Sequence, residues 1–352
     1  MTLTNINVLK PKTGPTRLEQ HRHCLQIKLI DFNRFRSTWQ RKPLSLRALS
    51  ISTTLNKSQG AVLVLPGFLF GSKPYLGLVN SLQQRGHAAA VVPVSSREWW
   101  PILLGSDHQW YLRRIDNELK ELYNKHGSVA LVGHSAGGWI ARILLGEDVP
   151  YQGLTFPGRR KKVHSLVTLG TPHASIEAYP LGYVPQRLII DPESVEKRKK
   201  SSGGSGEMPD ALRTSSLQFT NYFYPNASCL PGVQVVCAVG DAITGAAPAW
   251  RDKRPPKINH NVEGKKMELA AKLPGKDTWI AYEAYKSGCG DGAVAGDGVT
   301  PICIAHLPGA ENIILPGVWH GPKSRSPERP WYGDDLVLDR WVHYLNVGYS
   351  AP

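Results

Sequence analysis

Short runs of apolar residues recur along the chain from residue 61 onward. Six of these runs predict strands, at 61–65, 88–94, 129–133, 163–169, 233–239 and 311–315. Runs that are apolar throughout, without alternation, are typical of strands buried on both faces of a parallel sheet. The pattern therefore predicts an α/β fold with a doubly wound, mostly parallel sheet.

Helices are expected between and after these strands. Four segments have apolar residues at helical spacing, at 74–85, 107–125, 136–145 and 334–345. Gly86 is expected to end the first helix, and Asp107 is expected to cap the second. Right-handed crossovers through these helices would cover both faces of the sheet.

The positive charge of the chain is concentrated near its start. The net charge is +14, of which the first 50 residues carry +8. Residues 1–55 are rich in arginine, poor in acids and lack an apolar secretion segment, a composition typical of a transit peptide, with a disordered basic arm as the alternative. We expect the chloroplast as the destination, with the mitochondrion or cytoplasm as alternatives. No recognition motif accompanies the charge, so a nucleic acid is not an expected partner.

The remaining chain, 56–350, is expected to form one domain with a lid-like insertion at about 173–232. This insertion contains a flexible Ser- and Gly-rich stretch at 201–206 and shows no α/β alternation. The five cysteines contain no CxxC pair, which argues against a disulfide framework and against a zinc cluster. No apolar run approaches the roughly 18 residues of a membrane-spanning helix.

The strongest chemical signal lies where the third predicted strand meets a helix. The strand at 129–133 continues directly into Gly-His-Ser-Ala-Gly-Gly at 133–138. A G-x-S-x-G motif is weak alone, but a tight strand-to-helix turn strains the serine backbone and leaves room only for glycine at the flanking positions. Ser135 is therefore the expected nucleophile.

Three motifs together resemble the α/β-hydrolase superfamily, and within it the lipases and GPI-inositol-deacylase-like esterases of a plant or algal plastid type. They are Pro66-Gly67-Phe68 after the first strand, the GHSAGG sequence at 133–138, and Thr171-Pro172-His173 after the fourth strand. The resemblance covers about 61–172 and 233–345. It implies a serine hydrolase that cleaves carboxylic esters and needs neither a metal nor an organic cofactor.

A serine hydroxyl needs an imidazole to accept its proton. In α/β-hydrolases the order along the chain is serine, acid, histidine, with the histidine in a loop after the last strand. His320 follows the strand at 311–315 in such a loop and is the expected base. His173 is the main competitor.

The expected acid is Asp297, which must orient the imidazole and offset its charge. The segment Gly-Asp-Gly-Val-Thr-Pro at 296–301 resembles the one that carries the acid in the lipase relatives. Asp241, at the end of the strand 233–239, is the alternative, followed by Asp291. The backbone amides of Phe68 and Ala136 are the expected oxyanion donors.

Two apolar clusters, at 99–104 and 217–224, either line an acyl pocket or pack into the core. The pocket interpretation predicts a hydrophobic ester as substrate, reached by peripheral contact with a membrane. An acyltransferase or thioesterase with the same residues, and a non-catalytic binding protein of this fold, are the alternative functions. The sequence does not predict the oligomeric state.

Overall fold

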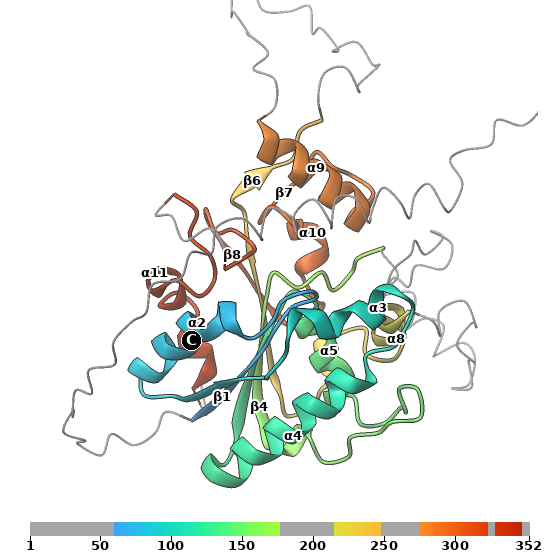
Figure 1. The fold of residues 1–352 in the computed structure, drawn as a ribbon, viewed down its shortest axis with the longest axis vertical. Helices are drawn as coiled ribbons and strands as arrows, with labels where there is room; N and C mark the ends of the chain where they lie inside the picture. The colour runs from blue at the N-terminus through green and yellow to red at the C-terminus, as the bar shows by residue number, and fades with distance from the viewer. Residues whose placement is uncertain (1–59, 177–214, 248–274, 323–327, 347–352) are drawn as a thin grey trace, which may run out of the picture. The chain divides into compact units, whose positions relative to one another are not determined.

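The computed structural model describes residues 60–176, 215–247, 275–322 and 328–346. In these ranges six strands form one sheet in the order β2-β1-β3-β4-β5-β8, and every neighbouring pair is parallel (Figure 1). The strands are β1 Ala61–Leu65, β2 Ala88–Val91, β3 Val129–His134, β4 Val163–Leu169, β5 Gln234–Gly240 and β8 Glu311–Leu315. All six predicted strands and the predicted fold class are confirmed.

Helices cover both faces of the sheet. The α-helices are α2 Leu76–Gln84, α3 Trp100–Leu103, α4 Gln109–His126, α5 Ala136–Leu145, α8 Ser216–Phe223, α9 Lys276–Cys289, α10 Ile302–Ala305 and α11 Asp335–Leu338. The 3-10 turns are η1 Lys73–Tyr75, η2 Ser96–Trp99, η3 Arg160–Lys162, η5 Ala227–Cys229 and η6 Val342–Leu345. Leu63 and Leu65 of β1 belong to a buried cluster with residues of α4, α5 and α8, whereas Val62 and Val64 belong to a second cluster with residues of α2, α11 and η6. Successive strand residues thus face two separate cores.

The first predicted helix is observed as η1 followed by α2, and Gly86 ends it with a φ of 90°. Asp107 lies one residue before the N-cap of α4, but its Oδ1 atom accepts the amide of Gln109 at 2.9 Å. The expected strand 88–94 ends early, at Val91. The amide of Val92 still donates to the carbonyl of Val64 at 2.9 Å, but the carbonyl of Val94 accepts the amide of Ser72 at 2.8 Å, so the chain has turned from β1 to the loop after it.

The prediction of one helix over 334–345 is wrong. The chain forms α11 and η6 instead, separated by a bend at Trp341. The indole of Trp341 is fully buried and donates to the carbonyl of Tyr332 at 2.9 Å. This long side chain is anchored in the core, so tertiary packing overrides the local helical pattern.

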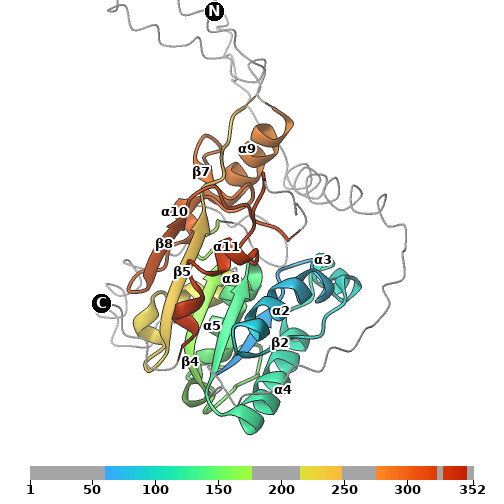
Figure 2. The same ribbon diagram turned by 90° about the vertical axis from the view of Figure 1, so that its left-hand side faces the viewer.

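The helices α9 and α10 and a small two-stranded sheet were not expected from the sequence. The strands β6 Ile243–Thr244 and β7 Ala295–Gly296 pair antiparallel, between α9 and α10 in space. Three of the four buried residues of α9, namely Ala281, Tyr285 and Gly288, lie at helical spacing, but two of them are small and the fourth buried residue is Glu283, so the apolar pattern is weak. Figure 2 shows α9, β7 and α10 at the carboxyl end of β5.

The expected transit peptide 1–55 and most of the expected insertion, 177–214, lie outside the described residues. Of the two apolar clusters, Trp99, Ile102 and Leu217 are fully buried core residues. Trp100 and Leu104, by contrast, are 46% and 87% exposed. None of the described helices is both long and apolar enough to cross a membrane.

Two of the four cationic side chains in the basic run at 159–162 are paired with carboxylates. Arg159 forms an ion pair with Asp116, and Arg160 forms one with Glu147. The ammonium group of Lys162 lies over the ring of Tyr123, at 3.8 Å from its centroid. The run is therefore part of the local structure and does not present an unbroken cationic face.

Candidate active site

Ser135 occupies a strained turn between β3 and α5. Its φ and ψ angles are 52° and −125°, a backbone region that non-glycine residues seldom adopt. A Cβ atom at Gly133 would lie 2.4 Å from the Cα atom of Gly138, and one at Gly137 would lie 2.5 Å from the carbonyl of Leu65. Only glycine fits at both positions, so the turn has the geometry that the motif predicts.

Two hydrogen bonds from β4 and the loop after it hold this turn in place. The amide of Ser135 donates to the carbonyl of Leu169 at 2.9 Å, and the hydroxyl of Thr171 donates to the carbonyl of Ser135 at 2.8 Å. The threonine of the Thr-Pro-His motif thus supports the serine backbone. Its role as an anchor was not anticipated.

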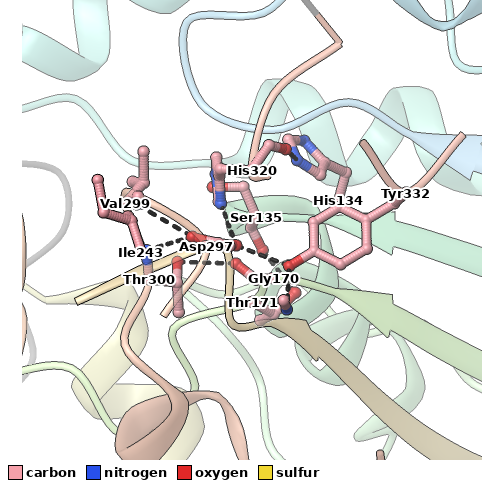
Figure 3. Close-up of polar contacts among 12 residues, drawn as sticks. His134, Ser135, Gly170, Thr171, Ile243, Asp297, Val299, Thr300, His320 and Tyr332 are labelled. Carbon is pink, nitrogen blue, oxygen red and sulfur yellow. Dashed lines mark hydrogen bonds and ion pairs between the residues drawn. The ribbon is translucent and has the colours of Figure 1, made fainter. Parts of the chain in front are cut away.

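His320 lies in the loop after β8, at the same edge of the sheet as Ser135 (Figure 3). Its Nδ1 atom is 2.7 Å from Oδ2 of Asp297, and its amide donates to the carbonyl of Asp297 at 2.8 Å. The side chains of His320 and Asp297 are 6% and 0% exposed. The structure therefore brings the three residues expected from the sequence to one place.

The carboxylate of Asp297 receives four hydrogen bonds. Its Oδ1 atom accepts the amides of Val299 at 3.0 Å and Thr300 at 2.7 Å, while Oδ2 accepts from His320 and from the hydroxyl of Tyr332 at 2.7 Å (Figure 3). These donors fill the acceptor capacity of an ionised carboxylate. Asp297 thus has two roles: it closes a tight turn and it orients the imidazole of His320.

Tyr332 is a site residue that sequence reasoning missed. Its hydroxyl donates to Asp297 and accepts the amide of Gly240, at the end of β5, at 2.9 Å. Burial, together with the nearby Asp297 charge, raises the pKa of Tyr332 well above its ordinary value. The phenol therefore stays protonated and keeps the acid oriented. No local motif marks this tyrosine.

The alternative acids and base are placed elsewhere. Asp241 accepts the amide of Gly317 at 2.7 Å, and Asp291 accepts that of Ala293 at 2.9 Å. The two ring nitrogens of His173 are bound to the guanidinium of Arg142 and to the hydroxyl of Thr168, each at 3.1 Å. These contacts are structural.

Of the two expected oxyanion donors, Ala136 directly follows Ser135, and Phe68 lies in the loop that passes beside it. Ala136 is the first residue of α5, where helix amides have no acceptor within the helix. Phe68 belongs to the turn closed by the amide of Phe70 and the carbonyl of Gly67, at 3.0 Å. A Cβ atom at Gly67 would lie 2.8 Å from that of Ser135, so this loop passes directly beside the serine.

Three buried histidines, His108, His134 and His173, predict acid sensitivity of the fold. Burial lowers the pKa of His108 from 6.5 to about 3, and lowers those of the other two well below 6.5. Below pH 6.5 the unfolded chain binds protons that the folded chain does not, so the free energy of unfolding falls as pH falls. Each histidine contributes up to about 1.4 kcal/mol per pH unit.

Urea denaturation between pH 7.5 and 5 measures this effect, in a range above most carboxylate titrations. We expect a steady loss of stability below pH 6.5, and a smaller slope in His108→Gln. A stability that stays constant down to pH 5 would contradict the assignment of neutral buried imidazoles.

Comparison with known protein families matches one segment of the chain. Residues 104–179, which include Ser135 and Thr171, match the family described as PGAP1-like alpha/beta domain. No curated protein matches the chain. Among the described residues, no group of three or more His, Cys, Asp or Glu side chains is arranged to hold a metal ion.

Solved structures with similarity to the chain include three enzymes of low identity. Tomato methylketone synthase I, complexed with 2-tridecanone, is 13% identical, with a TM-score of 0.31 over 54% of this chain and 81% of its own. Aspergillus fumigatus lipase B is 12% identical, with a TM-score of 0.29 over 52% and 38%. The RedJ thioesterase of Streptomyces coelicolor is 18% identical, with a TM-score of 0.27 over 59% and 81%.

Proposed function

We propose, from the membership of this chain in the α/β-hydrolase superfamily, that it is a serine hydrolase that cleaves carboxylic esters through an acyl-enzyme. The observation that carries the proposal is the buried hydrogen bond of 2.7 Å between Asp297 and His320, beside the strained Ser135. A base that is oriented by an acid and lies next to a half-buried serine is the arrangement that activates a serine hydroxyl.

In this mechanism His320 accepts the proton of Ser135 as the serine oxygen attacks the acyl carbon. Asp297 accepts from Nδ1 of His320 and so leaves Nε2 free to take that proton. The protonated imidazole then donates its proton to the departing alcohol. Water, deprotonated by the same imidazole, releases the acyl group and restores Ser135.

The negative oxygen of the tetrahedral intermediate would be bound by the amides of Ala136 and Phe68. Loss of one such donor typically costs about 10²–10³ in rate. Ala136 begins α5, whose N-terminal end favours negative charge. The close approach of Gly67 to Ser135 supports Phe68 as the second donor.

A hydrophobic ester is the proposed substrate class. Several apolar side chains near the carboxyl edge of the sheet are exposed, among them Trp100, Leu104 and, two residues after Asp297, Val299 at 44%. Apolar surface beside a reactive centre favours an apolar acyl chain. Peripheral membrane contact and a chloroplast location, through residues 1–55, belong to the same proposal.

The test uses the full-length chain and a fluorophosphonate probe, which reacts only with an activated serine. We expect phosphonylation of the peptide that contains Ser135, no labelling of Ser135→Ala, and hydrolysis of p-nitrophenyl esters with a preference for longer acyl chains. A folded wild type that is neither labelled nor active would favour the non-catalytic binding protein. Transfer of the acyl group to an added alcohol would favour the acyltransferase. Hydrolysis of a thioester in preference to the p-nitrophenyl esters would favour the thioesterase.

A further inference from the structure

A line of buried hydrogen bonds joins the loop after β1 to the loop that carries His320. The amide of Gly67 donates to the hydroxyl of Tyr75 at 3.0 Å, and this hydroxyl is 2.7 Å from Nδ1 of His134. The Nε2 atom of His134 is 2.7 Å from the carbonyl oxygen of His320 (Figure 3). Tyr75 and His134 are both 0% exposed. The connection therefore reaches from beside the proposed oxyanion donor Phe68 to the proposed base.

The chemistry of the acceptors sets the direction of each hydrogen bond. A carbonyl oxygen only accepts, so Nε2 of His134 carries a proton toward His320. Burial lowers the pKa of His134 well below its ordinary value, and the ring is neutral. Its Nδ1 atom must then accept from the hydroxyl of Tyr75, whose oxygen accepts in turn from Gly67. Every polar group in the line is satisfied by one tautomer of His134.

Aromatic rings hold His134 in this position. Its ring centroid lies 4.7 Å from that of His320, 5.6 Å from that of Phe70 and 6.2 Å from that of Trp331. A proton added to His134 would place a positive charge beside the imidazole that must itself become cationic during the reaction. The neutral ring supported by Tyr75 avoids this repulsion.

We propose that Tyr75 and His134 are positioning residues that hold the oxyanion loop, residues 66–70, and the His320 loop in register on either side of Ser135. This inference rests on the proposed function. Neither residue donates to the substrate; each acts through a backbone group, the amide of Gly67 or the carbonyl of His320. Their loss should therefore affect the reacting geometry more than substrate binding.

Tyr75→Phe tests the line while retaining the packed ring. The variant leaves the amide of Gly67 and Nδ1 of His134 without the hydroxyl, and small misplacements of reacting groups cost up to about 100-fold in rate. We expect kcat to fall by about 10- to 100-fold with KM unchanged, which is the signature of an interaction that matters in the transition state.

The matched control is Tyr151→Phe. This tyrosine is also buried, and its hydroxyl likewise has a backbone donor, the amide of His108 at 3.2 Å, and a side-chain partner, Ser216 at 2.7 Å. We expect a comparable loss of thermal stability in both variants but an unchanged kcat in the control. Equal losses of kcat in both, or a wild-type kcat in Tyr75→Phe, would overturn the proposal.

Two replacements of His134 separate the ends of the line. His134→Gln keeps a donor that reaches toward the carbonyl of His320, whereas His134→Ala keeps neither contact. We expect Gln to retain a clearly larger share of kcat than Ala. Equal activity of the two variants and the wild type would overturn the proposal.

The tautomer of His134 can be read without turnover, from the ring ¹⁵N chemical shifts of the wild-type protein. We expect the neutral form with the proton on Nε2, and a shift of the Nδ1 signal in Tyr75→Phe. A proton on Nδ1 would overturn the hydrogen-bond line. Absence of fluorophosphonate labelling and hydrolysis in the wild type would instead refute the proposed function, whereas an active wild type with an unaffected Tyr75→Phe would refute the positioning role alone.

Discussion

Replacing His320 with alanine is expected to lower kcat for ester hydrolysis by roughly 10⁶-fold. The serine hydroxyl then has no group within the site to accept its proton, because the other nearby imidazole, His134, has both nitrogens engaged by Tyr75 and by the carbonyl of His320. The fold should persist, since His320 contributes one side chain at the edge of the sheet. Steady-state hydrolysis of a p-nitrophenyl ester and a thermal unfolding curve measure the two effects.

His126→Ala is the control for this variant. His126 is exposed at the last residue of α4, at the opposite end of the strands from Ser135. It should retain the wild-type kcat. Near-normal activity of His320→Ala would refute its assignment as the base, and His173→Ala would then be examined as the competitor.

Replacing Asp297 with asparagine is expected to lower kcat by about 10⁴-fold. The variant preserves the shape of the side chain but places an amide where the carboxylate accepts from His320, Tyr332 and two backbone amides. His320 then has no acceptor that enforces a proton on Nδ1, and its imidazolium loses a compensating charge. Fluorophosphonate labelling should slow in parallel with ester hydrolysis.

The matched controls are Asp241→Asn and Asp291→Asn. Each of these carboxylates also accepts a hydrogen bond from a backbone amide in a loop, at 2.7 and 2.9 Å, but their partners are Gly317 and Ala293 and not His320. Each should keep kcat near the wild-type value. A severe loss in Asp241→Asn combined with a mild one in Asp297→Asn would transfer the role of the acid to Asp241.

The central sheet could be predicted because its inner strands β1 and β3 are buried at every position and are almost entirely apolar, whereas the edge strand β8 begins with Glu311 and Asn312 and gives a weaker signal. The segment at 276–305 could not, because α9 buries Glu283 and Gly288 beside Ala281 and Tyr285 and leaves Trp279 37% exposed. The face that α9 buries at helical spacing, Ala281, Tyr285 and Gly288, is only weakly apolar and gives a faint sequence pattern. The break before Trp341 was missed because the buried indole is bound to the carbonyl of Tyr332, a contact that the apolar pattern does not encode.

Ser135 could be predicted because its signal is local: strand, turn and helix lie within about twenty residues. The choice of Asp297 needed a family resemblance, since all three candidate aspartates lie in loops and differ only in what they meet in space. Tyr332 and Tyr75 could not be predicted at all. Their hydroxyls reach partners 35 and 59 positions away along the chain, and no pattern encodes such pairings.

The backbone conformation of Ser135 lowers the stability of the fold at the residue that carries the proposed nucleophile. A non-glycine residue in such a conformation costs on the order of 1–3 kcal/mol, a penalty that a glycine there would largely avoid. Selection for stability alone would therefore remove the hydroxyl. The rest of the domain therefore offsets the unfavourable conformational free energy of this turn. Substitutions that raise thermal stability should be sought at sites remote from it.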